Sequence, residues 1–417
     1  MLHVELQQGV LFHDGTPLTP ELVAESLRRD VANQSGLALA NVKRIDTWAR
    51  GIDIVLPTPD SFLLEDLGVT GIRRPGAPAV ATGPFKVLSN GPTVTLGAFD
   101  QYYKGPPSIQ SITIGSYPTQ RNAWAALMRS DIDMLQEVSQ DAIDFVVAES
   151  AVRAYSFPKS YYYVLAFNLH NPILSNIEVR RAINQAVNKD AIVADGLHGR
   201  ARPAAGPVWP ELWAASKRDG AVQFDPAAAQ RKLENAGYPM KPSDADHPPS
   251  RIRLTCLVWA DDARLVRTAL LLQKELQAVG IDLSLEPVRI TQLVPRLSKG
   301  QFDMFLFEMA NARTFTWVYL FWHSPQPGTT TFNFTGYTAA DTVLDAIRRA
   351  TTDEEIRKRT ADLQAVFAND PPAVFLAWET TTRAVSAQFS VPSQPGRDIL
   401  YSISQWKPVD GRQFAER

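Results

Sequence analysis

Alternating strand-like and helix-like segments in the C-terminal half constrain the fold of this chain more than any other feature. Residues 251–258, 281–288 and 302–307 are short apolar runs bounded by turn residues, which is typical of strands. Between the first two runs, apolar residues recur at helical spacing and end before a glycine: Leu265, Ala269, Leu272, Leu276, Val279 and Gly280. Residues 292–298 predict a second helix. This β-α-β-α-β order predicts an α/β fold, with a parallel sheet and helices on its faces.

Capping residues predict where other helices begin. Thr19 is expected to cap a helix whose first residue is Pro20. Asp225 is expected to cap a helix that starts at Pro226 and stops at Gly237. Further helices are expected after a capping box at residues 175–178 and over residues 120–130, 341–350 and 353–367. Strands are expected over residues 4–12, 52–56, 82–88, 93–96, 109–117, 131–135, 162–169, 373–378 and 400–404, and a loop over residues 71–83.

Composition limits the class of protein. A chain of 417 residues is expected to hold two or three lobes, and its hydrophobic content of 45% is ordinary for a globular protein. The net charge of −2 gives no reason to expect nucleic acid as a partner. The lone cysteine, Cys256, excludes a disulfide within the chain and a metal site of several cysteines.

Motifs for catalysis and for metal binding are missing from the sequence. It contains no nucleophile elbow, no zinc-protease motif and no glycine-rich phosphate loop. His13–Asp14 could suggest a metal or phosphohydrolase pair, but a turn between strand and helix is the favoured interpretation. Asp131 and Asp133 could form a carboxylate pair for glycoside hydrolysis, but acidic residues in this pattern more often lie at a solvated strand edge. The sequence therefore predicts a binding protein rather than an enzyme, with no cofactor and no metal site.

Segments along most of the chain, taken in order, resemble motifs of one protein family. They lie at residues 4–27, 81–87, 99–107, 126–134, 167–192, 199–207 and 224–238. The first contains Phe12-His-Asp-Gly15 and the last contains Phe224-Asp-Pro226 and ends in Ala236-Gly-Tyr238. All are similar to the family 5 extracellular solute-binding proteins, the ligand-capturing subunits of peptide and nickel ABC importers.

The resemblance implies a type II periplasmic binding protein fold, with two α/β lobes, a two-strand hinge and a small extra lobe. The ligand would bind in the cleft between the lobes, which close over it. The extra lobe would comprise residues 1–80, lobe I residues 81–165 with 385–417, and lobe III residues 166–384. The hinge would lie near Phe167–Asn168 and near residues 382–385.

The same resemblance implies a function and a location. The protein would capture a peptide-like or other small polar solute and deliver it to the transmembrane subunits of an ABC permease. It would be monomeric, and either periplasmic or extracellular and membrane-anchored. Because the first motif begins at residue 4 and no signal peptide precedes it in this numbering, we expect the chain to lack its N-terminal start.

The resemblance also indicates candidate ligand-binding residues. In peptide-binding members, an acidic residue after the strand corresponding to residues 302–307 pairs with the α-ammonium group of the ligand. Here that loop carries Asn311 and Arg313 instead, so recognition of a peptide N-terminus is in doubt. Arg313 would suit a carboxylate-bearing ligand, although it could equally be a surface arginine. Glu308 could replace the missing acid or be structural.

Four more residues complete the predicted site. Arg289 follows the strand at residues 281–288, where family members approach the ligand. Trp317 belongs to an aromatic group with Tyr319 and Trp322, of which at least one is expected to be core. Strand alternation places Tyr161 and Tyr163 on one face.

Two function classes remain open from the sequence. The first is the solute-binding subunit of an importer, and the second is the ligand-sensing domain of a transcription regulator whose DNA-binding part is missing. A hydrolase is disfavoured because its motifs are absent. The sequence does not identify the ligand.

Overall fold

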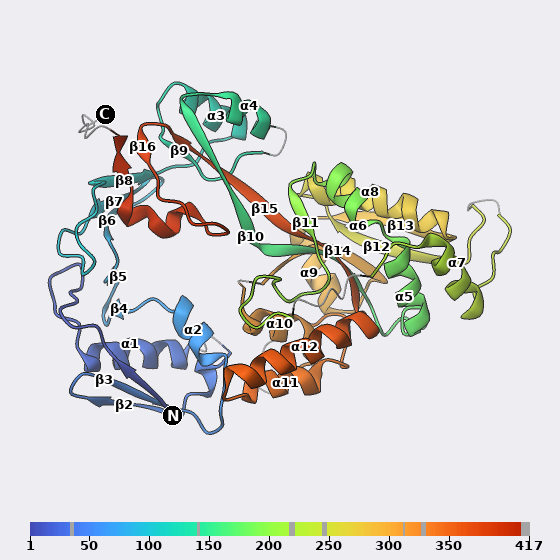
Figure 1. The fold of residues 1–417 in the computed structure, drawn as a ribbon, viewed down its shortest axis with the longest axis horizontal. Coiled ribbons are helices and arrows are strands. Elements are labelled where there is room, and N and C mark those ends of the chain that lie inside the picture. Colours follow the sequence, from blue (N-terminus) through green and yellow to red (C-terminus); the bar gives the residue numbers. More distant parts are fainter. Residues whose placement is uncertain are drawn as a thin grey trace. The chain divides into compact units, whose positions relative to one another are not determined.

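A computed structural model describes residues 1–33, 37–139, 142–216, 222–243, 248–311, 313–326 and 331–409. The chain divides into two compact units (Figure 1). The first comprises Met1–Pro59, Asp66–Pro158 and Thr381–Arg417, and the second comprises Asp60–Glu65 and Lys159–Thr380. The chain thus passes from one unit to the other within two long strands, after Pro158 and after Thr380. The three-lobe division stays a prediction.

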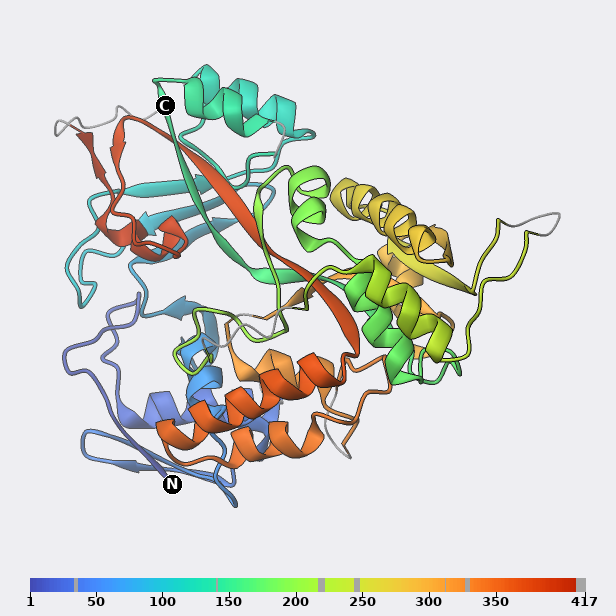
Figure 2. The same ribbon diagram turned by 45° about the vertical axis from the view of Figure 1, so that its right-hand side comes forward.

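The second unit is built on a mixed sheet with the order β11-β15-β10-β14-β12-β13. Strand β12 (Ile252–Trp259) pairs in parallel with both β13 (Ile281–Val288) and β14 (Met304–Ala310). Strand β10 (Val152–Phe167) runs antiparallel to β14, and β11 (Ala201–Pro203) antiparallel to β15 (Ala373–Ser386). The long strands β10 and β15 are neighbours in the sheet and lie side by side in both views (Figures 1 and 2).

The predicted β-α-β-α-β run is confirmed. Helix α8 (Ala263–Ala278) connects β12 to β13 and buries its predicted apolar stripe against the sheet. It ends before Gly280, whose φ of +86° is a backbone conformation that glycine adopts without strain. Helix α9 (Ile290–Ser298) connects β13 to β14. Parallel strands need such crossovers because the end of one strand and the start of the next lie at opposite edges of the sheet.

One face of this sheet packs on α8 and two other helices. These are α5 (Ile177–Ala186) and α7 (Pro226–Asn235), whose buried side chains share one core with β10, β12, β13 and β14. Asp225 caps α7 as predicted. The cap of α5 is Asn176, whose side chain accepts from the Glu178 amide, so the predicted Ser175–Glu178 capping box is wrong by one residue. A short helical segment follows, α6 (Lys189–Ala191) with a π-helical turn over Ile192–Gly196.

An aromatic core lies between the sheet and the remaining helices of the second unit. These helices are α10 (Phe315–Trp322), α11 (Asp341–Arg349) and α12 (Asp353–Asn369), the last two as predicted. Tyr162, Trp322, Phe367 and Phe375 meet there with ring centroids 5.2–6.0 Å apart. The segment Asp60–Glu65 joins this unit because the Glu65 carboxylate accepts from the first backbone amides of α10.

The first unit contains several small antiparallel sheets. They comprise β1 (Leu2–Glu5), β3 (Gly51–Val55) and β2 (Arg44–Trp48); β4 (Arg73–Arg74) and β5 (Ala77–Ala81); β6 (Phe85–Asn90), β7 (Val94–Ala98) and β8 (Ser111–Ile114); and β16 (Phe389–Ser390) and β17 (Lys407–Pro408). Strand β9 (Met134–Leu135) pairs with the end of β15. The helical elements are α1 (Pro20–Ala32), a 3-10 turn (Leu39–Asn41), α3 (Gln120–Met128), α4 (Ile143–Ala148) and a 3-10 helix (Ile399–Gln405). Helix α2 (Leu63–Val69) begins in the Asp60–Glu65 segment of the second unit and continues into the first.

Several sequence predictions are wrong in this unit. The strand expected over residues 4–12 ends at Glu5, and the loop expected over residues 71–83 contains the β4–β5 hairpin. Residues 400–404 are helical rather than extended. The Asp398 carboxylate accepts from the Leu400 amide and caps this helix, and a local capping bond of this kind competes with strand formation.

Candidate functional site

The carboxyl ends of the three parallel strands meet at one edge of the sheet in the second unit. Asp262 and Arg264 follow β12, Arg289 follows β13, and Asn311 follows β14. Ligands of open α/β sheets bind outside the carboxyl ends of parallel strands, because loops converge there without blocking the sheet. This edge is therefore the first place to look for a binding site.

Strand β10 brings further residues to the same edge. Its register pairs Tyr161 with Ala310 and Tyr163 with Glu308, and the Asn311 amide donates to the Ser160 carbonyl at 2.8 Å. Residues directly opposite in an antiparallel pair share a face of the sheet, so Tyr163 and Glu308 lie on the same face.

Six side chains form what we call the edge cluster. They are Lys159 and Tyr163 from β10, Asp262 and Arg264 from the start of α8, Glu308 from β14 and Glu379 from β15. Arg264 pairs with Asp262 at 2.8 Å and with Glu379. The Lys159 ammonium lies 3.1 Å from Glu379 and 3.4 Å from Glu308. Five charged groups thus come from four separate elements of the second unit.

Burial sets the electrostatics of the edge cluster. The side chains of Glu379 and Glu308 are 1% and 9% exposed. Burial, together with the neighbouring charge of Glu379, raises the pKa of Glu308 to about 7. Asp262 differs: burial opposes its ionisation, but hydrogen bonds from Arg264 outweigh that effect and lower its pKa. The pKa of Glu308 therefore lies near neutral pH.

The two predicted tyrosines have different surroundings. Tyr161 is 37% exposed, and the Lys159 ammonium lies 4.9 Å from its ring centroid. Tyr163 is only 1% exposed, under the Arg264 guanidinium, and its hydroxyl group has no hydrogen-bond partner among the described residues. Burial and then the charge of Glu379 raise the pKa of Tyr163, so it is a neutral phenol at physiological pH.

Asn311 and Arg313 lie beside a pair of tryptophans. Asn311 is 1% exposed and donates through Nδ2 to the Pro207 carbonyl at 2.6 Å, whereas its Oδ1 has no partner among the described residues. Arg313 is half-buried, with its guanidinium 4.9 Å from the Trp209 ring. Trp209 in turn packs edge-on against Trp378 at 4.9 Å. Arg313 thus packs on an aromatic ring, and its role in ligand binding stays a prediction.

The last two predicted residues, Trp317 and Arg289, differ in burial. Trp317 is half-buried in α10 and stacks on Phe321 at 5.8 Å, and its neighbours Tyr319 and Trp322 are core residues. Arg289 is exposed at the start of α9. A ligand role for both stays a prediction.

Sequence reasoning missed four members of the edge cluster. Lys159 and Glu379 lie in strands that are longer than predicted, and Asp262 and Arg264 lie where a strand turns into a helix. One signal was present: Glu379 follows the apolar run Ala373–Trp378, and a charged residue directly after a buried strand is unusual.

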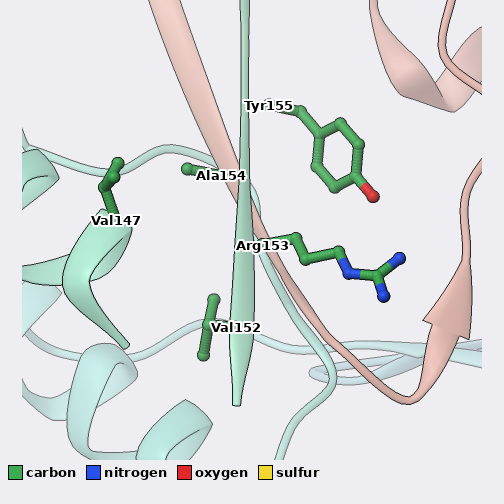
Figure 3. A pocket seen from close by; sticks show the side chains of 5 residues that line it. All are labelled: Val147, Val152, Arg153, Ala154 and Tyr155. Carbon is green, nitrogen blue, oxygen red and sulfur yellow. The ribbon is translucent and has the colours of Figure 1, made fainter. Parts of the chain in front are cut away.

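Two hollows in the described residues lie apart from the edge cluster. One, of about 400 Å³, is in the first unit and is lined by Val147 and residues 152–155. Figure 3 shows Val152 and Ala154 on one side of β10, and Arg153 and Tyr155 on the other. The second, of about 190 Å³, includes Arg181, Asn184 and Lys232 in the second unit. Neither contains a predicted ligand-binding residue.

The sequence motifs that suggested metal or acid chemistry have structural roles. The His13 ring contacts the Gly83 carbonyl at 3.0 Å, and Asp14 accepts from the Thr16 amide, so the pair forms the expected turn. Asp131 pairs with Arg129. Among the described residues, no three His, Cys, Asp or Glu side chains are placed to hold a metal ion. His247 lies outside the described residues.

Comparison with known proteins identifies the family. The model of the bacterial extracellular solute-binding proteins, family 5 (middle), matches residues 2–329. The chain belongs to this family. An oligopeptide-binding protein, AppA of Bacillus subtilis (strain 168), is 23% identical over 97% of this chain and 80% of its own length. The nickel-binding periplasmic protein of Escherichia coli (strain K12) is 26% identical over 72% of this chain and 62% of its own length.

A solved structure of the family confirms the fold. NikA from Brucella suis, in complex with Fe(III)-EDTA, has a TM-score of 0.84 at 20% identity, covering 97% of this chain and 88% of the other. The type II periplasmic binding protein fold predicted from the sequence is therefore correct. Within the described part of the chain, no helix combines the length and apolar character needed to cross a membrane.

We expect two substitutions of Arg313 to separate the contribution of its guanidinium to ligand affinity from the effect of its backbone strain on stability. Its φ of +60° is unfavourable for a residue with a Cβ atom, so Arg313→Gly should be more stable than Arg313→Ala by about 1 kcal/mol. Both variants lose the guanidinium, so both should weaken ligand binding equally. Denaturant unfolding and calorimetric titration measure the two effects. Wild-type affinity in both variants would exclude Arg313 from the binding site.

Proposed function

We propose that this protein is the solute-binding subunit of an ABC importer, which captures a peptide-like or other small polar solute and delivers it to the permease. Membership of family 5 supports the proposal, since the family consists of extracellular solute-binding proteins. The observation that carries it is the edge cluster, a group of buried polar side chains at the carboxyl ends of parallel strands. No chemical step is part of the proposed function.

The relatives support a polar solute but not one particular class. They include proteins named for binding oligopeptides, glutathione, nickel and haem. A common scaffold thus serves several ligands, and the side chains at the site decide which one binds. We place the ligand of this chain at the edge cluster together with Tyr161, Asn311 and Arg313, because these polar and aromatic groups converge there.

The setting of the protein is also part of the proposal. We propose a monomer outside the cytoplasm, in the periplasm or anchored at the cell surface, with the transmembrane permease subunits as partners. No observation supports the alternative of a ligand-sensing domain of a transcription regulator. The predicted hinge residues Phe167 and Asn168 lie inside the second unit, where Asn168 donates to the Phe302 carbonyl at 2.8 Å. Bending in β10 and β15, where the chain changes units, would instead couple ligand capture to closure.

A thermal-shift screen tests the proposed function. The panel consists of di- to pentapeptides, opines, oligosaccharides and nickel chelates. A solute that binds only the folded protein adds about 2.7 kcal/mol of stability at a hundredfold excess over its dissociation constant. We expect one class to raise the melting temperature.

Two variants locate the site of any solute that binds. Tyr161→Ala removes an exposed ring at the edge cluster, and Arg153→Ala removes a side chain that lines the hollow of the first unit. We expect Tyr161→Ala to abolish the shift and Arg153→Ala to preserve it. The opposite result would move the site to the first unit, and no shift with any class would reject the proposed function.

A further inference from the structure

The segment Asp60–Glu65, which we call the strap, binds the ends of two helices in the second unit. The Glu65 carboxylate accepts from the first two backbone amides of α10 at 2.9 Å each. At the other end of the strap, Ser61 donates through its amide and its hydroxyl group to two carbonyls in the last turn of α11. Helix ends need such partners because the helix itself provides none for these groups.

Buried contacts hold the strap against these two helices. The Phe62 side chain is fully buried, and its ring packs edge-on against Tyr319 of α10 with a centroid distance of 5.8 Å. The Asp60 carboxylate accepts from two nitrogens of the Arg348 guanidinium at 2.8 Å each, and this ion pair with α11 is also buried. A packed aromatic ring and a buried, doubly hydrogen-bonded ion pair restrict movement of the strap. The Glu65 carboxylate is therefore held in a defined place.

Helix α10 depends on Glu65 because its own capping residue bonds elsewhere. Thr314 is in the N-cap position, where a threonine side chain usually accepts from an amide in the first turn. Its side chain makes no such bond. Instead, the hydroxyl group and the amide of Thr314 donate to the Asn311 carbonyl at 3.2 and 3.1 Å. The cap of α10 thus comes from a residue 250 positions away in the sequence, and Thr314 closes the loop before the helix.

The loop that Thr314 closes contains a residue with a strained backbone. Arg313 has a φ of +60°, and a strained conformation of this kind persists only where the surrounding structure enforces it. Before Arg313, Asn311 donates to the Ser160 carbonyl at 2.8 Å and, through its side chain, to the Pro207 carbonyl at 2.6 Å. After Arg313, the strap fixes the start of α10. The strained residue therefore lies between two anchors.

We propose that Glu65 is a positioning residue for the candidate ligand-binding loop. By fixing the start of α10, its carboxylate keeps Arg313 in the left-handed conformation that places the guanidinium 4.9 Å from the Trp209 ring. A solute then meets an arginine that is already oriented, so binding does not have to order it. The inference rests on the proposed function and adds to it a residue that orients the site from outside the loop.

Backbone strain provides a test that needs no solute. Arg313→Gly should be more stable than Arg313→Ala, because only glycine adopts a positive φ without strain. If Glu65 enforces this φ, the difference should be lost in a Glu65→Ala background, since a released loop lets alanine move to a negative φ. Urea unfolding of the full chain measures the four stabilities. A difference that survives in Glu65→Ala would overturn the proposal, because a cap that only stabilises α10 leaves it unchanged.

Two further variants control this experiment. Glu354→Ala removes an exposed acid from the first turn of α12, so the difference should persist in that background. Glu65→Gln keeps one acceptor oxygen for one of the two amides, so it should lose part of the difference. If Glu65→Ala does not fold, Glu65→Gln decides the outcome, and an undiminished difference in Glu65→Gln then overturns the proposal.

Hydrogen exchange at the Thr314 amide provides a second readout. This amide bonds to the Asn311 carbonyl and not to Glu65, so its exchange reports on the loop rather than on the removed cap. We expect exchange about tenfold faster or more in Glu65→Ala, because the loop opens more often without its second anchor. Exchange in Glu354→Ala should equal that of the wild type. Unchanged exchange in Glu65→Ala would overturn the proposal.

Calorimetric titration connects the loop to solute capture. The probes are the peptides, opines, oligosaccharides and nickel chelates of the thermal-shift panel. A probe that binds the wild type should bind Glu65→Ala about tenfold more weakly or worse, and Glu354→Ala with unchanged affinity. Unchanged affinity in Glu65→Ala would overturn the inference and leave the proposed function standing. If no probe binds the wild type, the proposed function fails, whereas the strain test still shows whether Glu65 holds Arg313.

Discussion

Arg264→Ala is expected to lower the free energy of unfolding by about 3–5 kcal/mol, because it leaves buried carboxylates without their main counter-ion. Arg264 donates to both oxygens of Asp262 and also pairs with Glu379, whose side chain is 1% exposed. Without the guanidinium, Asp262 loses its ion-pair partner, and Lys159 remains beside Glu308 and Glu379. Removing one partner of a buried ion pair costs far more than the intact pair contributes, since the remaining charge stays desolvated.

The loss should depend on pH. When Arg264 is absent, the pKa values of Asp262 and Glu308 rise, so these acids bind protons in the folded state that they release in the unfolded state. Stability contributed by these protons is present at low pH and is lost as pH rises. The difference from wild type should therefore be smaller at pH 5 than at pH 8.

Arg202→Ala is the matched control for this experiment. Arg202 pairs with Glu211 at 3.2 Å, but both side chains are more than half exposed. An exposed pair of this kind contributes about 0–1 kcal/mol. Urea unfolding followed by circular dichroism compares the variants. Equal effects of the two substitutions would mean that the edge cluster is hydrated rather than buried.

Trp322→Ala should also be strongly destabilising, by about 3–5 kcal/mol, because it empties the aromatic core of the second unit. The Trp322 side chain is fully buried and packs on Phe367 and Phe375. Its indole N–H donates to the Tyr162 hydroxyl at 3.0 Å, so the substitution also leaves a buried hydroxyl with one fewer partner. A cavity and a lost hydrogen bond act in the same direction.

Trp213→Ala provides the comparison. Trp213 is 49% exposed, and the Arg357 guanidinium lies 5.1 Å from its ring. Its removal should cost about 1 kcal/mol or less, because little buried apolar area is lost. Differential scanning calorimetry of both variants measures the loss of stability that each substitution causes. A small effect of Trp322→Ala would show that α10 and α12 close over the space left by the ring.

The helices of the second unit could be predicted well because their signals are local. Asp225 caps α7 as expected from the sequence, α12 begins at Asp353 where its helix was expected, and Gly280 follows the end of α8. The parallel pairing of β12 with β13 and β14 followed from the order of the segments, since short crossover helices allow few other arrangements.

Strand lengths were predicted less well. Strands β10 and β15 extend beyond the apolar runs that indicated them, into polar residues such as Lys159 and Thr382. Hydrogen bonds between two neighbouring strands hold the backbone extended there, and a partner strand more than 200 residues away leaves no local pattern. For the same reason Lys159 and Glu379 could not be placed near a site.

The amino-acid sequence by itself determined the family, the α/β class and the positions of most helices, because motifs, caps and periodicity act over a few neighbouring residues. Asn311 and Glu308 could also be identified as candidate site residues, because their segment lacks the acid that the family resemblance led us to expect. Only the tertiary structure decided that Lys159, Arg264 and Glu379 join Glu308. Their charges interact because strand pairing brings separate elements within 4 Å in a buried environment. These distances and this burial depend on residues that are far apart in the sequence, so no single segment predicts them.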